Sequence, residues 1–565
     1  MNARGFGFVV PDEHDDDGDI YIASNRLGGA RNGDRVRTLV LTRYGDTRKR
    51  SGRIIKVLER LSAISGEIQS VVRSHDLPEE FSTEALTEAA HIETEPSERE
   101  IARRIDRRHL NIVTIDGADA KDLDDGVYAE KNSDGSYFLG VYIADVSHYV
   151  REGSPLDAEA YERGTSVYLV DRVLPMLPKE LSNGICSLNA GTERLSMACE
   201  MRLSASGRVE AYKIFPTVIS VRRRLSYEGV NKFFAGDRTE LTELSAMLST
   251  LKEIRDKRFK LRADRGAIDF ELGEIKVVLD DEGHPINVLK RRRELAESVI
   301  EECMLTANET VARHLSEKNI PSLYRVHEPP ASDNLERLNE LLNAFGFHLR
   351  IRMKGVKPSD IQKVLTAVKG RRGEHTVNTA TLRAMQQARY SAENVGHFGL
   401  AAQFYTHFTS PIRRYPDLIV HRLLKETLGN QAMSPARLKR WKKNLPEIAA
   451  QSSTRERIAV EAERESTMLK AVEYMQQFVG ATFEGMISGV TNFGFFVELE
   501  NGVDGLVRST GLRDDHYEFV EREYALIGRR TGRAFRVGDA VTVKLIEANV
   551  GLRQINFSLV DNAVE

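Results

Sequence analysis

The pattern of apolar and polar residues differs between the two ends of the chain and its middle. Residues 4–60 contain short runs of aromatic and β-branched residues separated by turn residues, and strands are expected at 5–11, 19–23 and 35–42. A small barrel is the simplest closure of such strands. Phe6 and Phe8 lie two residues apart on the first strand, so both rings share one face, as in OB and cold-shock folds that stack bases. The alternative is that one or both rings lie in the barrel core.

The middle of the chain mixes helical and strand patterns without any repeat. Residues 74–100 are polar and acidic and carry helical and turn signals, which fits a linker. From 111 to about 424 strands and helices mix, and residues 294–315 have the apolar spacing of an amphipathic helix. Residues 422–470 continue as helices. The pattern therefore predicts an α+β central domain with a helical tail.

The last segment returns to strands, which are expected at 483–490, 494–499, 505–507, 541–548 and 554–558. Their order and spacing predict a five-stranded OB barrel. Phe493, Phe495 and Phe496 flank Gly494 and are expected to form an aromatic face that binds RNA bases. Barrels at both ends of a larger domain are expected to clamp a strand of nucleic acid.

Composition narrows the class of protein. A chain of 565 residues needs three or four domains, and 41% apolar with 29% charged residues gives ample material for cores. No apolar run approaches the roughly 20 residues that span a bilayer, and the first residues do not resemble a signal peptide, so a cytoplasmic location is expected. Cys186, Cys199 and Cys303 lack metal-ligand spacing and are expected to be buried thiols.

The formal net charge of −3 is not typical of a nucleic-acid-binding protein, because phosphate binding relies on lysine and arginine. Basic residues nevertheless gather at 222–224, 290–293, 369–372 and 529–530. Each cluster alone is typical of a solvated face. The clusters favour nucleic-acid binding only if the fold brings them together on one channel.

The strongest local signal is the segment Thr114-Ile-Asp-Gly-Ala-Asp-Ala-Lys-Asp-Leu-Asp-Asp-Gly126, with five aspartates in ten residues. Apolar stretches precede and follow it, so the acids lie at a junction between strands, where their repulsion is costly without cations. Carboxylate ligands favour Mg²⁺ or Mn²⁺, and two such ions can hold an attacking water and a leaving 3′ oxygen across a phosphodiester. A calcium-binding loop is the alternative, but its glycine and terminal glutamate spacing is missing.

A second signal, His407-Phe-Thr-Ser-Pro-Ile-Arg-Arg-Tyr-Pro-Asp417, places two arginines between two prolines. Pro411 and Pro416 are expected to stiffen a loop that presents Arg413 and Arg414. Guanidinium groups bind phosphate through paired hydrogen bonds and stabilise the charge that builds up during phosphoryl transfer. An arginine pair alone is a weak signal, but together with the aspartates it predicts phosphodiester chemistry.

Both segments closely resemble signatures of the RNase II and RNase R family, the RNB exoribonucleases. The resemblance continues through blocks in the family's order at 144–150, 174–182, 266–270, 301–308, 323–327 and 396–401, and the arginine loop resembles the RNase R branch. The domains expected are 1–60, a truncated cold-shock or OB-like RNA-binding barrel; 61–105, a linker and lead-in segment; 106–425, the α+β RNB catalytic domain; 426–478, its helical tail; and 479–562, an S1-like OB barrel.

The resemblance implies roles for individual acids and arginines. Asp116, Asp122, Asp124 and Asp125 would form the metal cluster, with Asp119 outside it. Asp124, Asp125 and Arg413 would be catalytic. Arg413 would contact the terminal phosphates of RNA with support from Arg414.

The resemblance also assigns groups around that cluster. Tyr168 is expected to stack on a nucleotide near the 3′ end, the alternative being a core tyrosine, and Glu463 is expected to contact the RNA channel. His148, His327 and His407 are assigned structural roles, because a two-metal site generates its own hydroxide.

The activity implied is processive hydrolysis of single-stranded RNA from its 3′ end to nucleoside 5′-monophosphates, with Mg²⁺ or substituting Mn²⁺, in RNA turnover and quality control. A monomer is expected, and nothing in the sequence indicates association with a ribosome or helicase. One alternative is a non-catalytic OB-fold RNA-binding protein, which the concentrated acids argue against, and another is a two-metal endonuclease. The family usually carries two cold-shock barrels, so the one shortened barrel here predicts a weak grip on duplex RNA.

Overall fold

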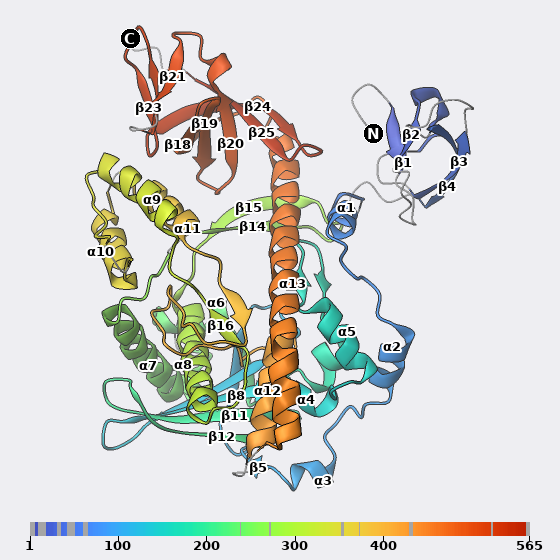
Figure 1. Cartoon of the computed structure of the whole chain (residues 1–565), viewed down its shortest axis with the longest axis vertical. Coiled ribbons are helices and arrows are strands. Elements are labelled where there is room, and N and C mark those ends of the chain that lie inside the picture. Colours follow the sequence, from blue (N-terminus) through green and yellow to red (C-terminus); the bar gives the residue numbers. More distant parts are fainter. Residues whose placement is uncertain are drawn as a thin grey trace.

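The computed structural model describes residues 6–9, 19–30, 35–41, 51–59, 66–237, 239–270, 273–351, 355–371, 373–428, 433–520 and 524–560. Figure 1 shows a small sheet near the N-terminus, a large central domain that mixes helices and strands, and a barrel near the C-terminus. Within these ranges no helix is both long enough and apolar enough to cross a bilayer.

A seven-stranded sheet forms the base of the central domain, with the strand order β13-β6-β7-β8-β11-β12-β5. The inner strands are antiparallel. At the two edges, β13 pairs in parallel with β6, and β5 pairs in parallel with β12. β8 is apolar and mostly buried along its length, as expected of a strand covered on both faces. The strands are β5 (Ile105–Asp106), β6 (Val113–Asp116), β7 (Asp125–Lys131), β8 (Tyr137–Ala144), β11 (Glu193–Leu203), β12 (Val209–Ser220) and β13 (Arg223–Ser226).

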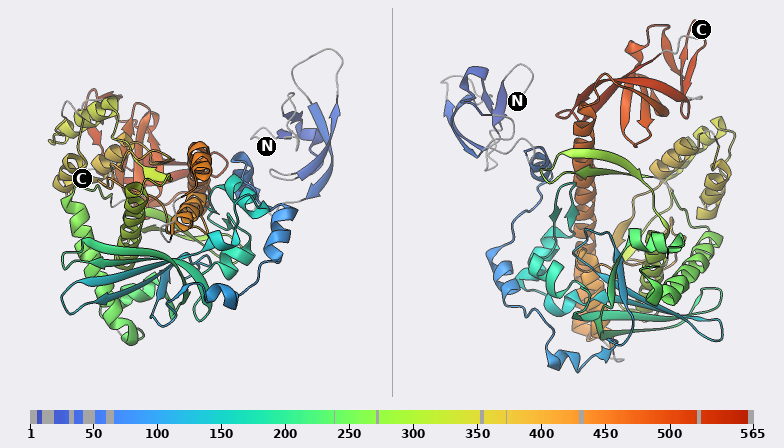
Figure 2. Two further views of the ribbon diagram at one scale, coloured as in Figure 1. Left: turned by 60° about the horizontal axis from the view of Figure 1, so that its bottom comes forward. Right: turned by 180° about the vertical axis from the view of Figure 1, so that it is seen from behind.

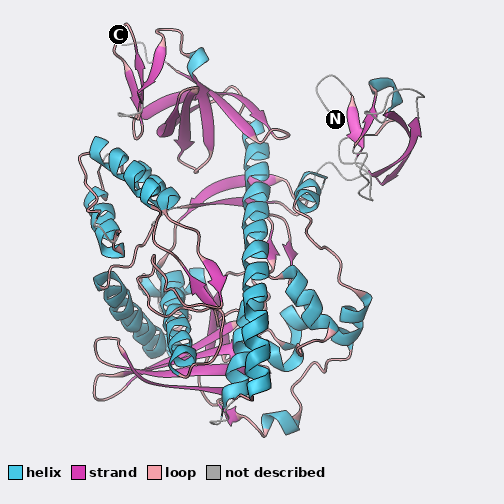
Figure 3. Cartoon of the chain, viewed as in Figure 1, coloured by secondary structure: helices cyan, strands magenta, loops and turns pink. Residues whose placement is uncertain are grey.

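Helices pack on this sheet and enclose the main core (Figure 3). The helix predicted at 294–315 is confirmed by α8 (Leu295–Glu317), which contacts β6, β8 and β12. The three cysteines are free and buried, as expected. The other helices of this domain are α4 (Val146–Tyr149), α5 (Pro155–Arg163), α6 (Tyr227–Phe234), α7 (Ser245–Asp264) and α12 (Tyr415–Thr427), and a separate small core joins α9 (Ser332–Ala344), α10 (Pro358–Val368) and α11 (Glu374–Ala384).

The predicted helical tail is dominated by one long helix, α13 (Pro435–Gln476), which runs from the base of the central domain to the C-terminal barrel (Figure 1). At about 1.5 Å per residue, its 42 residues span about 63 Å. The Ser434 hydroxyl accepts a hydrogen bond from the Arg437 amide and so caps the first turn. Three two-stranded sheets flank the helix: β9 (Val167–Tyr168) with β10 (Val173–Leu174), β14 (Glu274–Leu279) with β15 (Pro285–Arg291), and β16 (Tyr324–Val326) with β17 (Arg389–Ser391).

The C-terminal segment forms the predicted five-stranded closed barrel, in the order β18-β19-β20-β25-β24. Between β20 and β24 the chain also forms a three-stranded sheet that the sequence pattern did not reveal. The barrel strands are β18 (Thr482–Thr491), β19 (Gly494–Leu499), β20 (Asp504–Arg508), β24 (Ala540–Asn549) and β25 (Gln554–Leu559), and the added sheet consists of β21 (Tyr517–Val520), β22 (Ala525–Gly528) and β23 (Ala534–Arg536).

The expected aromatic face of this barrel needs one correction. Phe495 has no exposed surface, and its ring stacks on Phe535 with 4.9 Å between centroids. Side chains alternate along a strand, and β19 turns Phe495, Val497 and Leu499 into the core, so the prediction that Phe495 binds RNA is wrong. Phe493 is 50% exposed, and Phe496 is partly buried beside it.

The N-terminal sheet has the order β1-β2-β4-β3, and the loops between its strands lie mostly outside the described residues. Figure 2 shows it beyond the short helix α1. Phe6 and Phe8 lie together, as predicted, and Tyr21 joins them with ring centroids 5.3 and 5.8 Å away. The elements from here to the central domain are β1 (Gly7–Val9), β2 (Ile20–Ile22), β3 (Arg35–Leu41), β4 (Ser51–Glu59), α1 (Gly66–Ser74), α2 (Thr83–Ala90) and α3 (Glu98–Ile101).

Candidate active site

The acid-rich segment forms the turn between two neighbouring strands of the central sheet. Asp116 ends β6, and Asp125 begins β7. Four aspartates, Asp116, Asp122, Asp124 and Asp125, line a cavity of about 340 Å³. Asp119 is exposed and does not line this cavity, which agrees with its placement outside the cluster.

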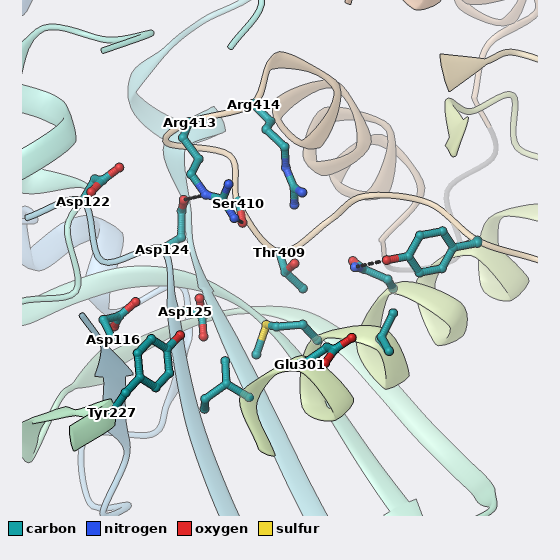
Figure 4. Close-up of a pocket in the computed structure, with 15 residues that line it drawn as sticks. Asp116, Asp122, Asp124, Asp125, Tyr227, Glu301, Thr409, Ser410, Arg413 and Arg414 are labelled. Carbon is teal, nitrogen blue, oxygen red and sulfur yellow. Dashed lines mark hydrogen bonds and ion pairs between the residues drawn. The ribbon is translucent and has the colours of Figure 1, made fainter. Parts of the chain in front are cut away.

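The arginine loop closes over these acids (Figure 4). The Ile412 amide donates a hydrogen bond of 2.8 Å to Oδ1 of Asp124. Arg413 points into the same cavity, with its Nε 3.8 Å from the other oxygen of Asp124. Two motifs almost 300 residues apart in the sequence therefore build one site.

The two arginines of the loop have different surroundings. The Arg414 guanidinium is largely buried and donates to Asp417, which also accepts the Ser410 amide, each bond being 2.8 Å long. Pro416 lies in the first turn of α12, where a proline is compatible with a helix, so it starts a helix rather than stiffening a loop. The Arg413 side chain is 42% exposed and can meet a ligand, whereas Arg414 supports the loop from within.

Tyr168 borders the cavity on the β9–β10 hairpin. Its hydroxyl donates to Asp122 at 2.5 Å, and its backbone amide donates to Glu463 of α13 at 2.8 Å. The residue is 38% exposed, while Val167 and Leu169 on either side are buried. Tyr168 is therefore not a core tyrosine, and Glu463 contacts it directly through a hydrogen bond to its backbone amide.

Comparisons with known proteins match this arrangement. The model of the RNB domain matches residues 104–430, that of the cold shock domain residues 8–82, and that of the S1 RNA binding domain residues 476–559. Ribonuclease R of Thermotoga maritima is 43% identical over 567 residues, which cover 99% of this chain and 80% of that protein. The chain belongs to the ribonuclease R branch of the RNB exoribonucleases.

Other relatives give the same assignment. Ribonuclease R of Escherichia coli is 38% identical and covers 99% of this chain, and this chain spans 70% of its length. Ribonuclease R 1 of Lactococcus lactis is 46% identical over 88% of this chain, and the match spans 61% of its length.

Solved structures extend the comparison to three dimensions. Apo RNase R of Mycoplasma genitalium is 28% identical, covers 99% of both chains and superposes with a TM-score of 0.82. A yeast pseudonuclease has a TM-score of 0.70 at 19% identity over 92% of this chain and 66% of its own. Because a pseudonuclease shares the fold, the fold alone does not establish catalysis.

Burial shifts the titration of the acids in this exoribonuclease fold. It raises the pKa of Asp116 to about 6, against the opposing charge of Arg224 and with a further rise from Asp122. It raises the pKa of Asp125 to about 8, with Asp116 as the next cause, and that of Asp124 well above its usual range. Carboxylates that resist ionisation in this way gain from a bound cation.

The donor set fits a hard divalent ion in part. Oδ2 of Asp116 and Oδ2 of Asp124 are buried without a hydrogen-bond partner. Among the described residues no group of three or more His, Cys, Asp or Glu side chains is arranged to hold a metal ion. Magnesium usually keeps several waters and takes only one or two carboxylates from the protein, together with substrate phosphates. The aspartates of the cavity can supply those carboxylates.

Several cavity residues had no assigned role in the sequence. Tyr227 begins α6, and Glu301 and Asn308 project from α8 into the cavity. Glu301 and Asn308 are seven residues apart, which places them on one helix face, and this spacing was visible in the predicted helix. The three histidines given structural roles, His148, His327 and His407, do not line the cavity.

Proposed function

We propose that the chain hydrolyses single-stranded RNA processively from the 3′ end and releases nucleoside 5′-monophosphates. The observation that carries the proposal is the contact of Asp124 with the arginine loop, which brings the acids and an exposed guanidinium into one cavity. RNase R of M. genitalium has been solved in complex with ribose-methylated single-stranded RNA and with double-stranded RNA. RNA is therefore the substrate class that this cavity is expected to take.

Asp116, Asp122, Asp124 and Asp125 would hold Mg²⁺, or Mn²⁺ in its place. Bound there, divalent ions supply an activated water and neutralise charge on the scissile phosphate. Arg413 would donate to the phosphate oxygens, with its backbone carbonyl held by the Ser166 amide at 2.9 Å and the Thr165 hydroxyl at 3.0 Å.

The remaining residues of the proposal bind RNA around this centre. The Tyr168 ring would stack on a nucleotide next to the 3′ end, positioned by Glu463 and Asp122. Arg414 supports Arg413. RNA bases would stack on Phe6, Phe8 and Tyr21 in the N-terminal sheet and on Phe493 and Phe496 at the C-terminal barrel.

The cellular setting is also a proposal. Buried free cysteines fit a reducing cytoplasm, where the enzyme would act in RNA turnover and quality control as a monomer. No described feature favours a ribosome or a helicase as its partner.

One assay tests the activity. A 5′-labelled single strand and a circular RNA of the same sequence are incubated with the chain, with Mg²⁺ or with EDTA, and the products are resolved by size. We expect the linear strand to shorten from its 3′ end only with Mg²⁺ and the circle to stay intact. Cleavage of the circle would indicate an endonuclease, and binding without cleavage would indicate an RNA-binding protein.

A further inference from the structure

Arg224 of β13 holds the turn that carries the acids. Its Nη2 donates hydrogen bonds of 2.7 Å to the carbonyl oxygens of Ala118 and Ala120, and the Gly117 carbonyl oxygen lies at 3.3 Å. All three oxygens belong to the backbone between Asp116 and Asp122. One guanidinium nitrogen therefore contacts three of the backbone carbonyl oxygens of this turn.

The sheet fixes where Arg224 stands. β13 pairs in parallel with β6, so that Arg224 is opposite Thr114 and Ser226 is opposite Asp116. The next residue, Tyr227, lines the cavity. β13 thus supplies Arg224 to the acid turn and leads directly into Tyr227 of α6, which lines the cavity.

The same turn is held at its other end by a buried serine. The Ser187 hydroxyl donates to the Lys121 carbonyl at 2.8 Å and accepts the Leu123 amide at 3.1 Å. Asp122 lies between these two bonds. Because Ser187 is buried in the core and Arg224 is exposed, only the arginine can be replaced without disturbing the packing.

We propose that Arg224 is a positioning residue that holds residues 117–122 in the shape in which Asp116 and Asp122 bind a divalent cation. Arg224 does not line the cavity and its Nη2 contacts the turn, so its effect on the cation is expected to pass through the turn. This inference rests on the proposed metal-dependent hydrolysis.

Charge and position predict opposite effects. The Arg224 charge lies close enough to Asp116 to interact with it, so it also repels a cation bound at that residue. Removing the charge alone would therefore strengthen cation binding. Releasing the turn would weaken it, because the cation would have to order the backbone that carries its ligands.

The experiment uses the full chain with Arg224→Ala, Arg224→Lys and the control Arg222→Ala. Arg224→Lys keeps the charge, but its side chain is one bond shorter, so its ammonium nitrogen cannot take the place of Nη2 between the three carbonyl oxygens. Arg222→Ala removes an exposed charge from the same sheet edge, while its backbone amide still donates to the Ile112 carbonyl. Binding of Mn²⁺ is titrated by electron paramagnetic resonance without RNA, and the Mg²⁺ concentration for half-maximal hydrolysis is measured separately.

We expect both Arg224 variants to bind Mn²⁺ roughly tenfold more weakly, a factor equal to about 1.4 kcal/mol and typical of hydrogen bonds from a charged donor. Both should need more Mg²⁺, with near-normal kcat at saturating Mg²⁺ and unchanged RNA affinity in EDTA. Arg222→Ala should match the wild type.

Tighter Mn²⁺ binding by Arg224→Ala, with Arg224→Lys like the wild type, would show that Arg224 affects the cation only through its charge. That result would overturn the inference. Equal binding by all variants would overturn it too, while the proposed function stands. If the wild-type chain binds no Mn²⁺ and cleaves RNA in EDTA, the proposed function fails and this inference falls with it.

Discussion

Asp124 is held by hydrogen bonds to both its side chain and its backbone. Its Oδ1 accepts the Ile412 amide at 2.8 Å, and its backbone carbonyl accepts the Ala144 amide at 2.9 Å. Its Oδ2 is buried, has no hydrogen-bond partner and faces Arg413. One oxygen therefore holds the arginine loop, and the other is left for chemistry.

Asp124→Asn should abolish hydrolysis but leave RNA binding intact or stronger. An asparagine oxygen can still accept the Ile412 amide, so the loop keeps its place while the charge is lost. We expect turnover to fall on the order of a hundredfold or more, as when other catalytic charge interactions are removed. Turnover is measured on single-stranded RNA and affinity by filter binding; a variant that keeps more than roughly a tenth of wild-type turnover would contradict the assignment.

The raised pKa values of Asp116 and Asp125 predict a pH-dependent metal requirement. A carboxyl whose pKa is higher in the folded than in the unfolded chain stabilises the fold at low pH, and this stabilisation is lost as pH rises through the folded value, here about 6 and about 8. At pH 6 Asp125 is protonated and Asp116 is half protonated, so Mg²⁺ must displace protons from both, whereas at pH 8 Asp116 is ionised and only the half-protonated Asp125 still has a proton to lose.

The increase in Tm that Mg²⁺ causes, relative to EDTA, should therefore be larger at pH 8 than at pH 6. Apparent Mg²⁺ affinity should rise by up to about tenfold per pH unit for each displaced proton. Both quantities follow from thermal melts over a Mg²⁺ series, with the Asp124→Asn variant as control. A Mg²⁺ effect that is equal at both pH values would show that these acids do not bind the ion.

At the scale of elements, the sequence pattern predicted individual strands and helices but not the contacts between distant segments. The five barrel strands and α8 follow from alternation and helical spacing, and each is close to its expected bounds. The acids and the arginine loop were found as motifs, but only the fold shows that Ile412 meets Asp124. Arg224 was one of a basic cluster, and its role depends on β13 pairing with β6, which no local pattern encodes.

The phenylalanines of β19 and its preceding turn show the same limit. All three were assigned to RNA, but the inward direction of Phe495 depends on the strand register, which the turn at Phe493 sets.

This register yields a paired prediction. Phe495→Ala should destabilise the barrel by about 3–5 kcal/mol, because it removes a buried ring stacked on Phe535. Phe493→Ala should leave the unfolding transition unchanged and weaken binding of long single-stranded RNA roughly tenfold, since one base stack is worth about 1–3 kcal/mol. Chemical denaturation and RNA titration separate the two; a stable Phe495→Ala variant with weakened RNA binding would restore Phe495 to the binding face.

At the scale of the whole molecule, α13 joins the C-terminal barrel to the active site. Glu463 accepts the Tyr168 amide at the edge of the cavity. Two residues along the helix, Glu465 pairs with His75, just after α1, at 2.7 Å and with Arg553 of the barrel. A short stretch of one helix thus contacts the lead-in segment, the barrel and the tyrosine proposed to stack on RNA.

Deletion of residues 479–565 should separate RNA capture from cleavage. Long RNA can occupy both the barrel and the catalytic cavity, so the truncated chain should bind it more weakly and with less dependence on salt. Oligonucleotides of about ten nucleotides, no longer than a single OB site, should still be cleaved, because the acids and the arginine loop lie outside the deleted part. Affinity over a salt series and cleavage of both substrates are the measurements.

Arg553→Ala in the full chain is the matched control, because it removes the contact of the barrel with Glu465 but keeps the barrel surface. If the truncated chain folds and cleaves nothing, while Arg553→Ala also loses cleavage of short oligonucleotides, the barrel acts through α13 on Tyr168 as well as on RNA. If Arg553→Ala cleaves normally, loss of activity on truncation instead reflects exposure of Val277, Val288 and Met475, which pack in the same core as the barrel. If the truncated chain and the Arg553→Ala variant both cleave short oligonucleotides, the barrel contributes only to the binding of long RNA.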